Sequence, residues 1–355
     1  MSAGLFDHWS DDARAAVGGV VADGAMPAES LATYARWWQI ETWLRELAYV
    51  ELRARYGESW IDQVKLALGR QRQDAEFKHM STADSENPLA YLDYSQLLTV
   101  IEANWDHMGY ALLEKRSWDG RQEELKRIRH RIGHVRKPHQ DDLGRLEQTL
   151  RDLERGAFIA CASYNRRRAP DPENFTDPVT TGWIGGEHVT AQRLIRHAKA
   201  QYGVTLKVTA SQRPWAVWPD SVENASGILW HAEFYMRHRT LEPTALWSQV
   251  RRLSPIVHVL TADPHAITFT FSAVDDSHLI SDLIGACFDS VLTCIRPVVK
   301  SVTDMDVREF RQWSNKVASV DYRVMGVSVW STVTESTVPI SMFSTGGGVS
   351  ILPEW

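Results

Sequence analysis

One short segment of the sequence gathers side chains that could act on a phosphate group. Residues 126–140, KRIRHRIGHVRKPHQ, contain three histidines, six cationic side chains and no acid. Histidine titrates near neutral pH and serves as either a base or an acid, while arginine offers a planar fork that matches phosphate oxygens. The segment therefore indicates acid–base chemistry on a phosphate whose charge the cations stabilise. The six cations are Lys126, Arg127, Arg129, Arg131, Arg136 and Lys137.

Helical spacing divides this segment into an apolar face and a polar face. At about 100° per residue, four apolar residues fall into one stripe that we expect to face the core. His130 and His134, four positions apart, stack on the opposite side, and Gly133 lies between the two faces. A glycine there costs about 1 kcal/mol of helix propensity relative to alanine, which predicts close approach by another backbone or a ligand. The apolar stripe consists of Leu125, Ile128, Ile132 and Val135.

The first half of the chain must supply the helices that position this segment. Apolar residues recur there at helical spacing, and helices of this kind bury their stripes against one another, which predicts an all-α helical bundle. Asp119, with Gln122 three residues later, predicts a capping box at the start of the cationic helix, and Pro138 ends it. A polar loop is expected over 71–87. The other expected helices run over 30–56, 60–68, 88–108 and 142–153.

The composition changes after the first half. Residues 169–182 contain three prolines and no apolar periodicity, so we expect a linker there. It separates a helical bundle over 30–168, preceded by an N-terminal extension over 1–29, from a C-terminal α+β domain over 183–355. In that domain the expected strands are 204–208, 228–236, 256–260, 267–271 and 322–330, and the expected helices are 194–200, 241–251 and 278–294.

The cationic helix resembles the motif helix of HEPN domains, a superfamily of small helical bundles rich in RNA-cleaving enzymes. Arg129 and His134 fit the R-x4-H motif of the family, although His130 stands where the family often has asparagine. Residues 40–47 resemble the first long helix of a HEPN subtype found in RNA endonucleases, and residues 94–105 resemble the helix before the motif. The resemblance covers the N-terminal half of the chain only.

The resemblance implies a metal-independent endoribonuclease that uses no cofactor and acts as a homodimer through the motif helix. In such an enzyme the ribose 2′-hydroxyl attacks the adjacent phosphorus, His134 acts as general acid or base, and Arg129 stabilises the phosphate. His130 is expected to be a supporting donor. Bacterial relatives are usually toxins or antiphage-defence effectors, so an antitoxin or another regulatory partner is a further expectation. The expected RNA-binding side chains are Lys126, Arg127, Arg131, Arg136 and Lys137.

Glu41 lies in the apolar stripe of its helix, where an ionised carboxylate needs a partner. Arg45, one turn along the same helix, is the local candidate, and Arg129 is the long-range one. A pair between Glu41 and Arg45 at the helix surface would be structural. A contact with Arg129 would instead make Glu41 and Arg45 supporting residues of the site, and the sequence leaves both alternatives open.

Other interpretations of the same residues stay open as well. The cationic helix could be a solvated face with no catalytic role. The bundle could be a catalytically silent HEPN module that binds RNA or a nucleotide and acts through a partner. The second domain could hold an unrelated enzyme, but it offers no recognisable reaction. Its cysteines, Cys287 and Cys294, lie on an apolar helix and are expected in the core.

Composition restricts the class of protein. The net charge of −6 argues against a protein that coats nucleic acid by bulk charge, so an anion-binding surface must be local. No window approaches the run of about 18 to 20 apolar residues that a membrane span needs. Three cysteines indicate a reducing compartment without a disulfide framework, and the acidic N-terminus does not look like a signal peptide. We therefore expect a cytoplasmic protein.

Overall fold

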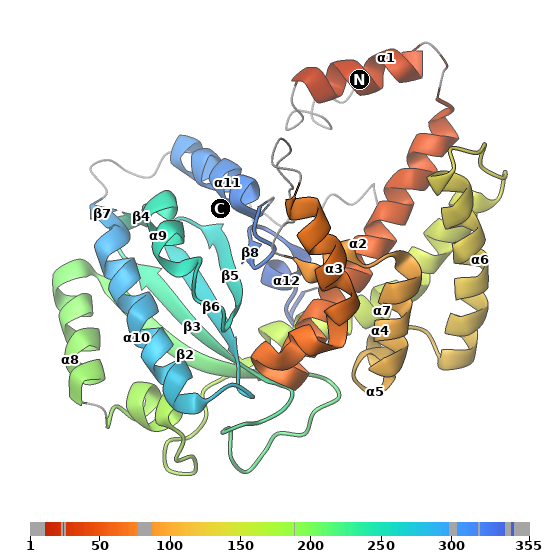
Figure 1. Ribbon diagram of the computed structural model, residues 1–355. Helices are drawn as coiled ribbons and strands as arrows, with labels where there is room; N and C mark the ends of the chain where they lie inside the picture. The colour runs from red at the N-terminus through yellow and green to blue at the C-terminus, as the bar shows by residue number, and fades with distance from the viewer. Residues whose placement is uncertain are drawn as a thin grey trace.

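The computed structural model describes residues 11–22, 24, 26–76, 87–187, 189–297, 304–318, 320–337 and 342–343. The first half is helical and the second half is built on a mixed sheet (Figure 1), which confirms the coarse architecture expected from the sequence. None of the described helices is long and apolar enough to cross a membrane. The elements of the first half are α1 (Asp11–Ala22), α2 (Ala28–Tyr56), η1 (Gly57–Val64), α3 (Lys65–Ala75), η2 (Pro88–Tyr91), α4 (Tyr94–Ala103), α5 (Trp105–Met108), η3 (Gly109–Ala111), α6 (Lys115–Gly133) and α7 (Asp142–Asn165).

The second half forms a six-stranded sheet in the order β1-β2-β3-β6-β5-β8, in which β5 and β8 are parallel and the other neighbours are antiparallel. Helix α10 lies across one face of the sheet, while α2 and α7 contact the sheet from the helical half (Figure 1). The elements are β1 (Arg167–Arg168), η4 (Thr180–Ile184), α8 (Val189–His197), η5 (Ala198–Tyr202), β2 (Val204–Gln212), β3 (Ile228–Met236), β4 (Arg239–Leu241), α9 (Pro243–Val250), β5 (Ile256–Asp263), β6 (Ala266–Ser272), α10 (Ser277–Cys294), β7 (Ile295–Pro297), α11 (Asp304–Ala318), β8 (Val324–Met325) and α12 (Val329–Thr332).

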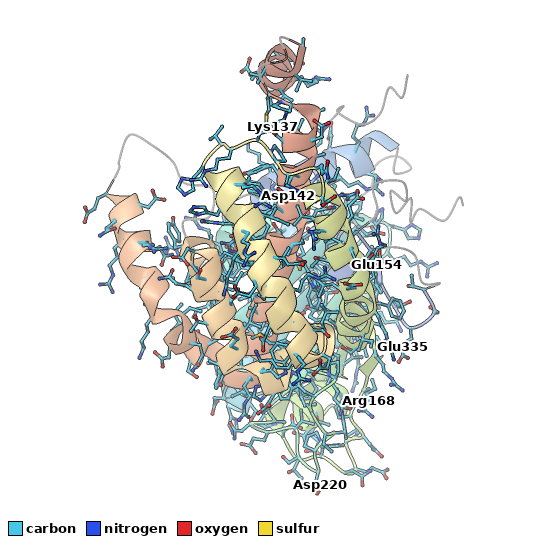
Figure 2. The ribbon with its side chains drawn as sticks, turned by 90° about the vertical axis from the view of Figure 1, so that its right-hand side faces the viewer. Lys137, Asp142, Glu154, Arg168, Asp220 and Glu335 are labelled. Atoms are coloured by element: carbon cyan, nitrogen blue, oxygen red, sulfur yellow. The ribbon has the colours of Figure 1, made fainter. Side chains whose placement is uncertain are left out.

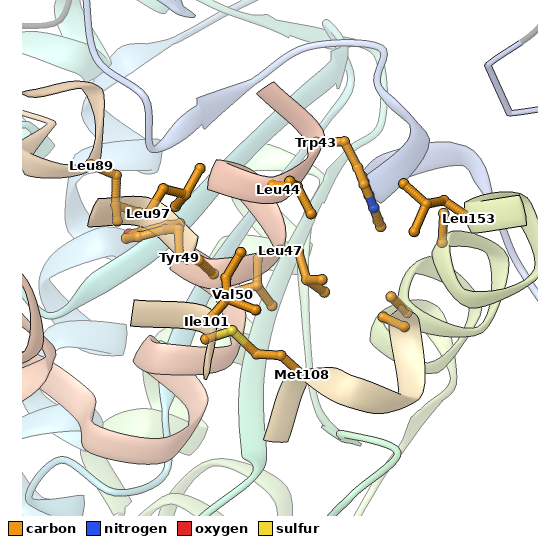
Figure 3. Packing of buried hydrophobic residues seen from close by; sticks show 14 of the residues in the cluster. Trp43, Leu44, Leu47, Tyr49, Val50, Leu89, Leu97, Ile101, Met108 and Leu153 are labelled. Atoms are coloured by element: carbon orange, nitrogen blue, oxygen red, sulfur yellow. The ribbon is translucent and has the colours of Figure 1, made fainter. Parts of the chain in front are cut away.

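Helix α2 is the long central helix of the first half, and most residues of its second half are buried. Gly57 ends it with a φ of +55°, a conformation that favours glycine, and Asp275 lies where a Cβ atom of that residue would be. Figure 3 shows apolar side chains of α2 meeting those of η2, α4, α5 and α7. The residues labelled there are Trp43, Leu44, Leu47, Tyr49, Val50, Leu89, Leu97, Ile101, Met108 and Leu153.

The cationic helix, α6, starts one turn earlier than the sequence predicts. Its first residue is Lys115 rather than Asp119, because the Glu114 carboxylate accepts a hydrogen bond from the Ser117 amide at 3.2 Å. Asp119 lies inside the helix and pairs with Lys115 at the surface. The earlier start adds a turn that carries Trp118, which is fully buried and anchors the helix in the bundle.

Two further expected elements, a helix and a strand, are shorter than the sequence predicts, because in each a polar side chain caps the start of a new helix. The helix expected over 88–108 is interrupted, because Asp93 and Gln96 form a capping box that starts α4. The strand expected over 322–330 shrinks to the two residues of β8, since Ser328 precedes the short helix α12 as its N-cap. Apolar periodicity indicates the type of an element, whereas these caps decide where it begins.

The remaining expectations for the N-terminal half hold in outline. The helix expected over 60–68 is the 3-10 helix η1 followed by α3, which continues to Ala75 and so enters the loop expected over 71–87. Residues 77–86 of that loop lie outside the described residues. The N-terminal extension expected over 1–29 contains α1, none of whose described residues is buried.

The end of the expected linker over 169–182 is packed against the second half, where Val179 belongs to the hydrophobic core. The Asp177 carboxylate accepts hydrogen bonds from the Val179 and Thr180 amides at 3.1 and 2.9 Å, and these three residues are buried. Strand β1 already pairs with β2 before this segment begins. The chain therefore already takes part in the sheet before residue 169, and the domain boundary at this segment stays a prediction.

One hydrophobic core crosses from the helices into the second half. The cluster around α2 includes Val257 of β5 and Trp330 of α12. Trp330 stacks on Trp43 with the ring centroids 5.5 Å apart. A second cluster fills the other face of the sheet beneath α10, and it contains Cys287 and Cys294, which confirms their expected core positions.

A buried ion pair crosses the same boundary. Glu51 of α2 and Arg213, which follows β2, have side chains that are both 0% exposed. The Glu51 carboxylate accepts hydrogen bonds from Arg213 Nε at 3.0 Å, from the Tyr110 hydroxyl at 2.7 Å and from the Trp215 indole at 2.6 Å. Arg213 also donates to the Ala160 carbonyl at 3.0 Å. Buried charges are tolerated only with such partners, so this pair binds α2 to the sheet.

A second buried network joins α7 to the sheet through two histidines. The Tyr164 hydroxyl lies 3.0 Å from His258 Nδ1 and 2.8 Å from Thr270 Oγ1, which in turn lies 3.1 Å from His231 Nδ1. His231 Nε2 contacts Ser211 Oγ at 2.7 Å. Burial, with help from nearby arginines, lowers the pKa of His258 to about 3 and holds the pKa of His231 well below its ordinary value. Both rings are therefore neutral in the folded chain.

These two histidines predict a loss of stability in mild acid. Unfolded histidines take up protons below a pKa of about 6.5, but His231 and His258 cannot do so in the folded state, so the free energy of unfolding should fall with pH by about 1.4 kcal/mol per pH unit for each. Glu46, whose pKa is raised from 4.5 to about 7, acts in the opposite direction between those values. The two histidines outweigh it.

Urea unfolding at several pH values between 6.5 and 4.5 measures this slope. His258→Asn should reduce the slope, because one of the two suppressed protonations is removed. His278→Gln is the matched control, since that side chain is exposed on α10, and it should leave the slope unchanged. A wild-type stability that is flat across this pH range would contradict the assignment of two buried neutral rings.

The ion pair across the two halves predicts a large effect of breaking it. Glu51→Gln leaves the Arg213 charge buried without a counter-ion, so the free energy of unfolding should fall by about 3–5 kcal/mol. The exposed pair Lys115–Asp119 is the control, because Asp119→Asn should change stability by less than about 1 kcal/mol. Denaturant unfolding measures both, and equal effects of the two substitutions would show that the buried pair is not the stronger constraint.

Candidate active site

Helix α6 ends beside its histidines in a tight C-terminal turn. Gly133 is the last helical residue. The Arg136 amide then donates to the Arg131 carbonyl at 2.9 Å, and the Val135 amide donates to the Ile132 carbonyl at 3.1 Å. This pattern of hydrogen bonds closes a helix through a residue in the left-handed conformation, a position usually taken by glycine. Here that residue is Val135, with a φ of +54°.

Val135 is the member of the expected apolar stripe that does not face the core. Leu125 and Ile128 are buried and Ile132 is half-buried, but Val135 is 94% exposed because the helix ends before it. A β-branched residue at positive φ is strained, and strain of this kind is concentrated at functional sites. The chain thus holds an exposed apolar side chain in an unfavourable backbone conformation directly after His134.

The two histidines of α6 form a pair, as their spacing predicts. The rings of His130 and His134 are exposed and meet edge to face, with their centroids 4.3 Å apart. The positive charge of His134 is the main cause that lowers the pKa of His130, and Arg136 and Arg129 act in the same direction. His130 therefore stays neutral at a pH where an isolated histidine already takes up a proton.

Arg131 pairs with an acid of the same chain, and its expected role in binding RNA stays a prediction. Its guanidinium forms two hydrogen bonds with the Asp142 carboxylate at the start of α7, one of them from Nε at 2.8 Å. The same carboxylate accepts the His139 amide at 3.0 Å. Burial alone would raise the pKa of Asp142, but these bonds hold it below its ordinary value. These bonds fix the loop between α6 and α7. Figure 2 labels Lys137 in this loop and Asp142 at the start of α7.

The other cations of the segment are exposed, either on α6 or in the loop that follows it. Lys126 lies 3.6 Å from Glu123, a surface contact of little strength. The remaining four have no acidic partner among the residues that the structure describes, so their charge is available to an anion. They are Arg127, Arg129, Arg136 and Lys137.

Arg129 and Gly133 face a different space from the histidines. They line a cavity of about 700 Å³ whose other walls come from α2, η2, β5 and described residues between Asn315 and Ser328. Neither His130 nor His134 lines this cavity. A Cβ atom at Gly133 would meet nothing within 4 Å, so the expected close approach is not made within the described chain. Of the two residues of the R-x4-H motif, Arg129 therefore lines the cavity, whereas His134 is exposed outside it.

Glu41 also lines the cavity, but its partner is Arg45 rather than Arg129. The two side chains lie 2.6 Å apart, and the Trp37 indole donates to the Glu41 carboxylate at 2.7 Å. Arg45 also donates to the Leu89 carbonyl at 2.9 Å, which holds η2 against α2. Of the two alternatives left open by the sequence, the structure has the local one.

Glu46 lines the same cavity, although it is not among the site residues expected from the sequence. Its carboxylate accepts the Trp330 indole at 3.0 Å. Burial raises the pKa of Glu46 to about 7, and the indole bond opposes that shift. Tyr49 and His258 form neighbouring parts of the wall, with ring centroids 5.5 Å apart. A carboxylate within the apolar stretch of α2 was the available signal, but its partner lies 284 positions away.

Comparison with known proteins adds no identification to this geometry. No protein-family model, no curated protein and no solved structure matches the chain. The resemblance to HEPN domains therefore stays a prediction based on the residues quoted above. The features that bear on function are the two exposed histidines, the cations of the same segment that have no acidic partner among the described residues, and the cavity beside them.

The contact between the two rings predicts a shift that can be measured. His134→Ala removes the main source of repulsion, so the pKa of His130 should rise toward the ordinary histidine value of about 6.5. NMR titration of the ring protons measures it in both proteins. His139→Ala removes an exposed histidine from the following loop and should leave His130 unchanged. If His130 titrates identically in wild type and His134→Ala, the two rings do not interact in solution.

Proposed function

We propose that this chain is a metal-independent endoribonuclease whose active centre lies at the C-terminal end of α6. The observation that carries the proposal is the exposed pair of His130 and His134, in a segment with four cations that have no acidic partner in the described part of the chain. Unpaired cations attract the phosphates of a nucleic acid locally, even though the net charge of the chain is −6.

The two rings divide the proton transfers of the proposed reaction. The ribose 2′-oxygen attacks the adjacent phosphorus while the neutral ring of His130 takes its proton. The bond from phosphorus to the 5′-oxygen breaks, and the protonated ring of His134 gives that oxygen a proton. The products are a 2′,3′-cyclic phosphate and a 5′-hydroxyl. The lowered pKa of His130 supports its assignment as the base, a larger role than the supporting one expected from the sequence.

The proposed centre is formed by two copies of the chain, because one helix cannot enclose a phosphate. Two features of the helix end support an interface there. Val135 presents an exposed apolar side chain, and burial of that side chain against a second copy would be favourable. Gly133 leaves open space in which a second backbone can come close. The cations of both copies would then surround one phosphodiester.

A second candidate function is a module that binds RNA or a nucleotide without cutting it. The observation that favours it is the division of the motif, since Arg129 lines the cavity and His134 does not. A single chain with this geometry presents a phosphate-binding cation away from its acid–base pair. The nuclease proposal requires a second copy to bring them together, whereas the binding module does not.

The proposed cellular role is that of a toxin or antiphage-defence effector, restrained by an antitoxin or another regulatory protein. This role rests on the HEPN resemblance alone. The α+β half would then select the substrate or respond to a signal. An endoribonuclease whose histidines are exposed needs such restraint, because any accessible RNA would otherwise be a substrate.

RNA cleavage in the presence of EDTA tests the nuclease proposal. Wild type should cut single-stranded RNA to leave cyclic-phosphate ends, and His134→Ala should lower the rate at least about a hundredfold, the usual contribution of a general acid. Arg129→Ala should lower it by a similar factor, because it removes the stabilisation of charge that develops in the transition state.

Arg116→Ala is the matched control for this experiment. Arg116 is an exposed cation on the first turn of the same helix, far along α6 from the histidines, so its removal should leave cleavage nearly unchanged. Circular dichroism confirms that each variant is folded. If folded wild type binds RNA but leaves it intact, and His134→Ala binds equally well, the binding module replaces the nuclease.

A further inference from the structure

The cavity beside α6 has the size of a site for a small ligand. Its volume of about 700 Å³ lies within the range of about 300–1,000 Å³ that is usual for ligand-binding pockets. It lies between the two halves of the chain, since α2, η2 and the end of α6 form one side, while β5 and described residues between Asn315 and Ser328 form the other. Interfaces of this kind are common places for binding sites.

Two exposed aromatic rings stand beside each other in the lining of this cavity. Trp38 is 61% exposed and Tyr34 is 45% exposed, with their ring centroids 6.3 Å apart. Neither ring is needed for the core, in contrast to the neighbouring Trp37, which is 5% exposed. An exposed tryptophan in the wall of a cavity offers a planar surface for another planar ring. Stacking of a nucleic-acid base on such a ring contributes about 1–3 kcal/mol.

Among the described residues, Glu46 and Arg129 are two polar groups of the cavity that can still bind a ligand. Glu41 and Arg45 satisfy each other. One oxygen of Glu46 accepts the Trp330 indole, while the other has no hydrogen-bond donor among the described residues. That oxygen is a free acceptor for an N–H group. Arg129, near the end of α6, has no acidic partner among the described residues and can bind a phosphate.

We infer that this cavity is a nucleobase subsite, in which a base stacks on Trp38, an N–H group of its edge donates to Glu46, and the attached phosphate binds Arg129. The inference rests on the proposed function for its biological meaning, because it assigns the cavity to a nucleotide next to the bond that is cut. A planar ring, an N–H donor and an anion together match the three unused features of the cavity. A nucleotide carries all three within one residue.

The raised pKa of Glu46 is consistent with a ligand that donates an N–H group to its carboxylate. Because burial raises the pKa of its carboxyl group to about 7, the group is poorly stabilised as an anion by the surrounding side chains. An N–H donor from a base would provide the hydrogen bond that the second oxygen lacks. The geometry of the cavity and its aromatic rings carry the inference, and this shift is consistent with it.

Equilibrium binding of a short 2′-O-methyl oligonucleotide tests the subsite, because no 2′-hydroxyl is then available for cleavage. Titration calorimetry with the full chain should show that Trp38→Ala weakens binding about tenfold or more, from the loss of stacking. Glu46→Gln should weaken it by a smaller factor while keeping an acceptor for the Trp330 indole. Tyr235→Ala, which removes an exposed aromatic ring of β3 outside the cavity, should bind like wild type.

An oligonucleotide of the same length whose sugars carry no bases provides the decisive comparison. Wild type and Trp38→Ala should bind it equally, because the two proteins differ only in their ability to stack on a base. A second arm uses nucleoside 5′-monophosphates. Binding of a monophosphate as tight as that of the oligonucleotide, and dependent on Trp38, supports the subsite with a free nucleotide as its ligand. Tight and Trp38-dependent binding of the oligonucleotide alone supports the subsite with an RNA chain.

The inference is overturned if folded Trp38→Ala binds the base-carrying oligonucleotide as tightly as wild type does. It is also overturned if the loss of binding is the same with and without bases. The outcome is separate from that of the cleavage experiment. Binding that depends on Trp38 in a protein that does not cut RNA would retain the subsite and reject the nuclease. Cleavage of RNA together with binding that does not depend on Trp38 would retain the nuclease and reject the subsite.

Discussion

The ion pair between Glu51 and Arg213 is the constraint on which the relation of the two halves depends. A carboxylate and a guanidinium with no exposed surface are stable only while they stay paired, so α2 and the sheet cannot separate without leaving a buried charge. The Tyr110 hydroxyl and the Trp215 indole donate to the same carboxylate and tie further segments to it. Because α2 is one wall of the cavity and the second half supplies the other, this pair also holds the cavity together.

The end of α6 depends on a weaker but local constraint. Arg131 is drawn into a pair with Asp142, and this pair fixes the loop that turns the chain back into α7. The helix ends at Gly133, the two histidines are exposed, and Val135 has a positive φ. Arg131, which the sequence predicts as a contact for RNA, thus also helps to fix the loop that follows the histidines.

The sequence predicts those parts of the fold and site that depend on neighbours along the chain. Strand β3 occupies the expected range 228–236, and His130 meets His134 because residues four apart share a helix face. The sequence could not predict Glu46 as part of a cavity, since its partner Trp330 comes from a segment expected to be a strand. The coarse architecture follows from periodicity. The cavity forms where tertiary contacts bring together segments that are far apart in the sequence, and no motif of the sequence links those segments.

The division of the motif between two surfaces has a consistent explanation if both proposals hold. A base bound in the cavity would place its phosphate at Arg129, on the side of α6 that the histidines of the same copy do not line. The histidines that act on this phosphate would then belong to a second copy that approaches over Gly133, where the chain leaves open space. One copy would bind the nucleotide and the other would transfer the protons. Cleavage would depend on dimerisation by geometry alone, and an isolated chain would bind RNA without cutting it.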